Sequence, residues 1–101
     1  MKFAVEVRDF CILLKHDTIN LVYINQIIRS SSSIGANFIE ANENLGKQDL
    51  LMRLKISRKE AKETAFWFNL LEVDNIEKIE SLKKEAGELR KIFSAIINKL
   101  K

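Results

Sequence analysis

Hydrophobic residues recur along this chain at intervals of three and four positions, and short polar segments interrupt the pattern at three places. Such spacing gathers apolar side chains on one side of an α-helix, so it predicts four helices joined by short turns. The chain of 101 residues contains no proline, the residue that most strongly breaks a helix. The predicted helices are about Lys2–Lys15, about Ile19–Asn44, one that follows Gly46 and continues to about Val73, and Ile76–Lys101.

The apolar side of each predicted helix indicates where a core forms. In the first helix it comprises Phe3, Val7, Phe10 and Leu14. In the second helix we expect the inner side at Leu21, Ile24, Ile28, Ser31 and Ser32. In the fourth helix a seven-residue pattern comprises Ile79, Leu82, Ala86, Leu89, Phe93, Ile96 and Leu100. An all-α, antiparallel up-and-down four-helix bundle is the simplest way to bury these sides, in a single domain over residues 1–101.

The third helix carries apolar residues on two sides. One side comprises Leu50, Leu54, Ala61, Ala65 and Phe68, and the other comprises Met52, Ile56, Trp67 and Leu70. A helix buried on one side within its own bundle needs a further cover for the second side. We therefore expect the second set to form an interface between copies of the chain.

Polar residues at the helix ends and in the second helix have structural interpretations. Asp17 or Thr18 is expected to cap the second helix, and the small residues from Ser30 to Ala36 favour close approach of a neighbouring helix. Asn37 and Glu40 lie beside this run and are expected to hydrogen-bond across to Arg53 or Ser57, because polar groups in a packed contact need partners.

The net charge of +3 is concentrated in one segment. Between Gly46 and Thr64 basic residues exceed acidic ones by three, and the remainder of the chain is balanced. At about 100° per residue, Lys55, Arg58, Lys59 and Lys62 fall within about a third of the circumference of the third helix. Such a stripe is suited to binding phosphates of nucleic acid. The alternative interpretation is a solvated face whose lysines pair with Glu60 and Glu63.

The residues do not assemble a catalytic or metal-binding motif. A di-iron bundle needs two Glu-x-x-His motifs, whereas the sole histidine is His16. Cys11 lies in an apolar run, where we expect a buried and unreactive thiol. We therefore expect no enzyme activity, cofactor, metal or small-molecule substrate. No apolar stretch reaches the length of about 20 residues that spans a bilayer, and a lone cysteine is typical of a cytoplasmic protein.

Two segments carry a family resemblance. The segment Arg29–Ala41 (RSSSSIGANFIEA) resembles the second-helix signature of small four-helix-bundle proteins encoded in 23S rRNA intervening sequences. Asp49-Leu50, KISRKEAKET over residues 55–64 and WFNLL over residues 67–71 resemble the third-helix signature. Many members open the third helix with a serine, where this chain has Gly46.

This resemblance implies an antiparallel four-helix bundle that assembles as a homopentamer. A related protein of the same fold is the accessory variability protein of diversity-generating retroelements, which forms a positively charged ring and binds nucleic acid together with a reverse transcriptase. The resemblance implies no catalytic activity, although a ribosomal-protein label is often attached to the family. We expect a cytoplasmic homo-oligomer that binds RNA or DNA through Lys55, Arg58, Lys59 and Lys62, with Arg53 as a further candidate. The alternative is a protein–protein scaffold that uses the exposed apolar side of the third helix.

Overall fold

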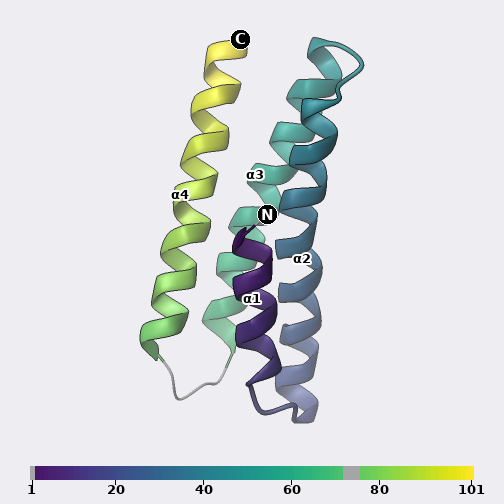
Figure 1. Ribbon diagram of the computed structural model, residues 1–101. Helices are drawn as coiled ribbons and strands as arrows, with labels where there is room; N and C mark the ends of the chain where they lie inside the picture. The colour runs from purple at the N-terminus through teal and green to yellow at the C-terminus, as the bar shows by residue number, and fades with distance from the viewer. Residues whose placement is uncertain (1, 72–75) are drawn as a thin grey trace.

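The computed structural model describes residues 2–71 and 76–101, which form four α-helices and no strand. The helices are α1 (Lys2–Ile12), α2 (Thr18–Asn42), α3 (Lys47–Leu70) and α4 (Ile76–Leu100). They run alternately up and down along a body of 44 × 20 × 19 Å (Figure 1). The predicted all-α four-helix bundle is confirmed.

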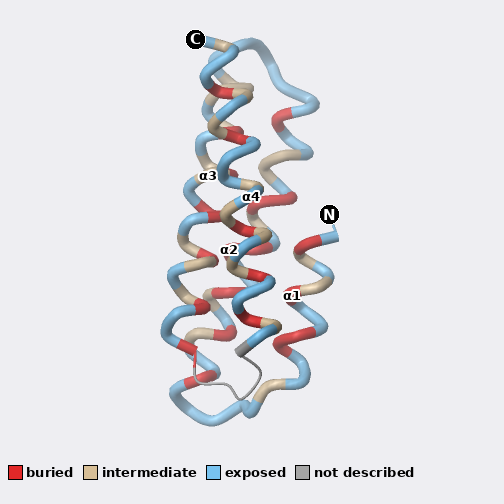
Figure 2. Tube along the Cα trace, turned by 90° about the vertical axis from the view of Figure 1, so that its left-hand side faces the viewer, coloured by how far each residue is buried: buried red, intermediate tan, exposed pale blue. Residues whose placement is uncertain are grey.

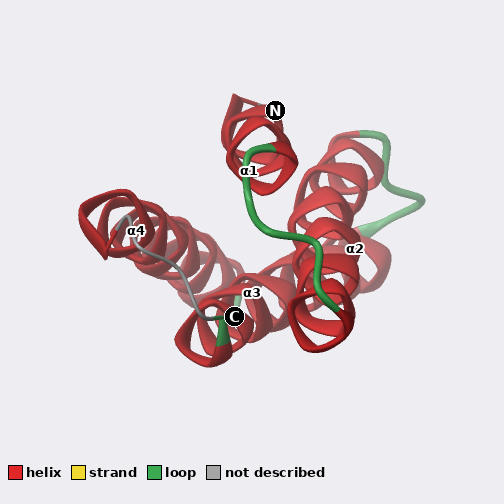
Figure 3. Ribbon diagram, turned by 90° about the horizontal axis from the view of Figure 1, so that it is seen from below, coloured by secondary structure: helices red, strands yellow, loops and turns green. Residues whose placement is uncertain are grey.

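The helices differ in length, and this shapes the bundle. The end-on view shows α3 between α2 and α4, with α1 on the opposite side of the molecule (Figure 3). Whereas α2 and α4 have 25 residues each, α1 has 11. Helix α1 therefore covers only the half of the bundle near its connection to α2, and the other half consists of α2, α3 and α4 (Figures 1 and 2).

The first connection is tighter than the sequence predicted. Helix α1 ends at Ile12 instead of near Lys15, because the amides of Leu13 and Leu14 bond to carbonyls three residues earlier, each at 3.2 Å. Asp17 then caps α2, as expected, because its Oδ1 accepts a hydrogen bond from the Asn20 amide at 2.8 Å.

The connection between α2 and α3 turns at Gly46. This residue has a φ of 133°, a conformation that side chains disfavour and that glycine adopts without strain. Asp49 Oδ2 accepts a hydrogen bond from the Leu45 amide at 3.1 Å and so supports the start of α3. At its other end α3 stops at Leu70, before the predicted end near Val73. The turn predicted at Asp74-Asn75 lies outside the described residues.

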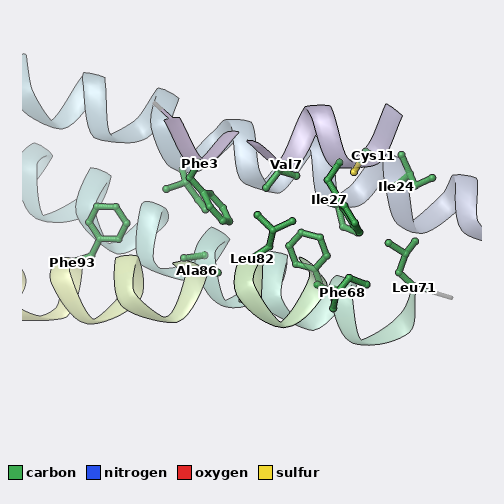
Figure 4. Close-up of a cluster of buried hydrophobic side chains, with 14 of the residues drawn as sticks. Phe3, Val7, Cys11, Ile24, Ile27, Phe68, Leu71, Leu82, Ala86 and Phe93 are labelled. Carbon is green, nitrogen blue, oxygen red and sulfur yellow. The ribbon is translucent and has the colours of Figure 1, made fainter. Parts of the chain in front are cut away.

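All four helices contribute to one hydrophobic core (Figure 4). Phe10 of α1 meets Phe68 of α3 with ring centroids 6.3 Å apart, and Phe38 of α2 meets Phe93 of α4 at 5.9 Å. The predicted apolar side of α4 is confirmed: four of its members are buried and three are partly buried, in order Ile79, Leu82, Ala86 and Phe93, then Leu89, Ile96 and Leu100.

The predicted inner side of α2 was partly wrong. Ile24 and Ser31 are buried as expected, but Leu21 is 41% exposed, Ile28 is 38% exposed, and Ser32 is exposed as well. Instead the buried side is completed by Asn20, Ile27, Ser30, Ile34, Gly35 and Ala41. The physical reason is the position of α3, which approaches α2 from the side of Ser30 and Ile34 and draws that side into the interior.

Candidate nucleic-acid interface

Hydrogen bonds to α2 fix the rotation of α3 about its own axis. Thr64 Oγ1 lies 2.8 Å from Ser30 Oγ, and the Ser57 hydroxyl donates to the carbonyl oxygen of Ile34 at 3.1 Å. All these groups are buried, so each contact replaces hydration that the polar groups lose on folding. With Ser57 and Thr64 held against α2, the basic stripe on the far side of α3 faces outward.

Three of the five predicted phosphate contacts have no acidic partner of their own. Among residues 2–71 and 76–101, no carboxylate lies within 4.0 Å of Lys55, Arg58 or Lys62. Lys55 and Lys62 are exposed, and Arg58 is half-buried. Their charges are therefore available to an external anion.

Lys59 is almost as free. Its Nζ lies 4.0 Å from Glu63 Oε1, at the limit of an ion pair, and its side chain is exposed. Exposed pairs of this kind contribute little, about 0.3–0.5 kcal/mol within a helix. A competing phosphate can displace such a contact, so Lys59 belongs with the three unpaired cations.

Arg53 is separated from the other four. It lies on the side of α3 that faces α2, where its Nη1 donates to Asn37 Oδ1 at 3.2 Å and its Nε lies 3.7 Å from Asp49 Oδ1. The sequence anticipated a hydrogen bond between Asn37 and Arg53, and the structure contains it. Glu40, the second member of the expected polar pair, is exposed.

Glu60 and Glu63 of α3 pair with a residue that the sequence did not single out. Arg29 of α2 places its Nη2 3.4 Å from Glu60 Oε2 and 3.2 Å from Glu63 Oε2. Glu60 is only 6% exposed and pairs with Arg29, so the alternative interpretation, in which lysines of its own helix pair with it, does not hold for Glu60. One signal was present in the sequence: Glu60 lies between Ser57 and Thr64 at helical spacing, on a side that packs.

The predicted oligomer residues line the flank of α3 next to the basic stripe. Met52 is 47% exposed and Leu70 is 41% exposed, while Ile56 and Trp67 are half-buried. Trp67 contacts the ring of Tyr23 from α2, with centroids 6.2 Å apart. Two exposed aliphatic residues and a half-buried indole thus share one side of the α2–α3 pair.

The remaining candidate chemistry is confined to the end of α1. Burial raises the pKa of the Cys11 thiol to about 11, so the reactive thiolate is scarce at neutral pH. His16 Nε2 lies 3.1 Å from the Cys11 carbonyl oxygen, a backbone contact. In the described part of the chain, no three potential metal ligands cluster. Nor do the described helices include one long and apolar enough to cross a bilayer.

Comparisons with known proteins agree with this architecture. Residues 1–95 match the model of a family described as 23S rRNA-intervening sequence protein. A crystal structure of a protein of unknown function from Bacteroides thetaiotaomicron, described as belonging to the S23 ribosomal protein family, superposes with a TM-score of 0.87. The two sequences are 35% identical, and the alignment covers 95% of this chain and 92% of that one. No curated protein matches the chain. By its sequence and its fold, the chain belongs to the 23S rRNA-intervening sequence protein family.

Proposed function

We propose that this chain is a non-enzymatic cytoplasmic protein that assembles with copies of itself and binds RNA or DNA electrostatically. Lys55, Arg58, Lys59 and Lys62 are its phosphate contacts. One observation carries the proposal: α3 separates its charges, so that its acids pair with arginines on the α2 side while these cations remain outward. Cations that neutralise phosphates supply most of the sequence-independent affinity of a protein for nucleic acid.

Self-assembly strengthens this binding. Four cations on one chain produce a weak field, whereas a ring of copies repeats the stripe and sums the potentials. The exposed apolar flank at Met52 and Leu70 supports such an assembly, because contact between copies removes it from water. We place the number of copies at five, as the family resemblance implies.

A salt titration with a charge-matched control tests the proposal. The triple variant Lys55→Gln/Arg58→Gln/Lys62→Gln is compared with Lys2→Gln/Lys15→Gln/Lys99→Gln, which removes three exposed cations elsewhere. Binding to a fluorescently labelled RNA hairpin is measured by anisotropy at several salt concentrations. The slope of log K against log salt is negative, and its magnitude should decrease by about 0.7 to 0.9 for each phosphate that the variant no longer neutralises.

Both variants have the same net charge, so a general charge effect weakens both alike. The proposal requires a clearly larger loss of affinity and of salt slope in the α3 variant. Wild-type protein that fails to bind, or whose binding does not respond to salt, contradicts it.

A second candidate function is a protein–protein scaffold, which the same apolar flank favours. In that case Met52, Ile56, Trp67 and Leu70 dock an amphipathic helix of another protein. Apolar contact resists salt, whereas phosphate contact does not. A specific protein partner whose binding persists at about 1 M salt and disappears in Leu70→Glu therefore supports the scaffold over nucleic-acid binding.

A further inference from the structure

A cation on α4 lies beside the basic stripe of α3. Arg90 is exposed, and within residues 2–71 and 76–101 no carboxylate approaches it within 4.0 Å. Its neighbour Lys83, by contrast, is held at 2.8 Å by Glu80. Arg90 on α4 thus resembles the unpaired cations on α3.

The rotation of each helix places Arg58 and Arg90 on the flanks where α3 and α4 adjoin. On α3, Thr64 marks the side toward α2, and Arg58 lies about 120° around the helix from it, toward α4. On α4, Glu85 marks the side toward α1 because it interacts with Glu6, and Arg90 lies about 140° away from Glu85. Since α3 lies opposite α1, this turns Arg90 toward α3 (Figure 3).

The two arginines also lie at the same height in the bundle. Arg53 bonds to Asn37, and the next residue of α2, Phe38, contacts Phe93 of α4, so residues 53 and 93 share a level. Toward the α3–α4 connection, Arg58 lies five residues from that level and Arg90 lies three. At 1.5 Å per residue these displacements are about 7.5 Å and 4.5 Å, a difference of less than one helical turn.

Among the described residues, no carboxylate lies within 4.0 Å of Arg58 or Arg90. The acids of α3 lie on the α2 side, and Glu80 of α4 is engaged with Lys83. Like charges on neighbouring positions repel, and an anion bound between them relieves that repulsion. Gly87, one turn before Arg90, has nothing within 4 Å of where a Cβ would stand, so space is open beside the pair.

We infer that Arg90 extends the nucleic-acid interface from α3 onto α4, where it and Arg58 bind one phosphodiester backbone between them. The inference rests on the proposed function and adds a residue that the α3 stripe does not contain. Guanidinium groups suit this role because their planar donors bind phosphate oxygens in pairs. The backbone crosses from one helix to the next instead of following α3 alone.

The test compares Arg90→Gln with Arg58→Gln and with the control Lys99→Gln, an exposed cation on the opposite side of α4 from Arg90. The probe is the same labelled RNA hairpin, measured over a salt series after circular dichroism has shown equal helix content. We expect Arg90→Gln to weaken binding as much as Arg58→Gln does. It should also reduce the magnitude of the salt slope by about 0.7 to 0.9. Lys99→Gln should bind with the affinity and the salt slope of the wild type.

The outcomes separate the two levels of the proposal. If Arg58→Gln weakens binding and Arg90→Gln behaves as Lys99→Gln, the extension onto α4 is wrong and the α3 interface stands. If wild-type protein does not bind in a salt-dependent way, both proposals are wrong.

Discussion

At the scale of single residues, buried hydroxyl groups hold α3 in its orientation. Thr64 Oγ1 lies 2.8 Å from Ser30 Oγ and 2.8 Å from the Glu60 carbonyl oxygen, and Thr64 and Ser30 are fully buried. The basic stripe faces outward because this contact, that of Ser57 and the buried apolar residues of α3 all face inward. Small polar residues thus control the direction of the charged ones.

Replacing Thr64 by Val keeps the shape of the side chain and removes its hydroxyl. We expect the variant to lose about 1 kcal/mol of unfolding free energy, because a net hydrogen bond contributes about that much and the Ser30 hydroxyl still donates to the Ile27 carbonyl oxygen. Urea denaturation measures the change. In the double variant Ser30→Ala/Thr64→Val, the loss should be smaller than the sum of the single losses, because both changes remove the same contact.

Individual contacts differed in how far the sequence revealed them. The bond between Asn37 and Arg53 was foreseeable, because both lie near a run of small residues where helices approach closely. The pairing of Arg29 with Glu60 was not. A charged partner on the same helix follows from spacing, whereas a partner on another helix depends on how the two helices are aligned.

At the scale of helix pairs, the contact of α1 with α4 contains an acidic pair. Burial raises the pKa of Glu85, a hydrogen bond and repulsion from Glu6 raise it further, Lys78 opposes the shift and Glu88 adds to it. The folded chain therefore binds more protons than the unfolded chain above the usual pKa of 4.5. Stability consequently decreases as pH rises through the folded pKa of Glu85.

Glu85→Gln removes this dependence. We expect the variant to melt at a higher temperature than wild type at pH 7, and the difference to shrink as pH falls toward 4.5 and below, where Glu85 is protonated in both states. Thermal unfolding followed by circular dichroism across this range measures it. A difference that stays constant with pH would show that ionisation of Glu85 is not the cause.

The sequence predicted the number and order of the helices because hydrophobic spacing sets both. It predicted only part of the inner side of α2. Apolar residues surround much of that helix, so several inner sides were compatible with the spacing, and only the approach of α3 selects one. The early end of α1 depends on a backbone turn after Ile12 that no side-chain pattern marks.

At the scale of the whole molecule, the charge surplus and the apolar flank of α3 lie side by side. The sequence identified both, since each follows one helix at regular spacing. The proximity of Arg90 to Arg58 could not be predicted from the sequence, because it depends on the level at which α3 and α4 pass each other. A surface formed by one helix can be predicted from the spacing of its residues in the sequence. A surface shared by two helices can be identified only from the three-dimensional structure.

The apolar flank leads to a prediction about assembly. Leu70→Glu places a charge on this flank, and we expect it to lower the mass of the particle in solution, because a carboxylate is costly to bury at a contact between copies. Light scattering coupled to gel filtration measures the mass. The control Leu13→Glu changes an exposed leucine at the end of α1 and should leave the assembly intact. Wild-type protein that runs as a single chain contradicts the assembly.

Cys11 lies on the inner side of α1, in the hydrophobic core, and it carries the single thiol group of the chain. Alkylating reagents attack the thiolate and must reach it, so in the closed fold this sulfur is both protonated and shielded. Reaction then requires the shortest helix to lift away from the other three. The rate at which Cys11 is alkylated therefore reports how often α1 detaches from the rest of the bundle.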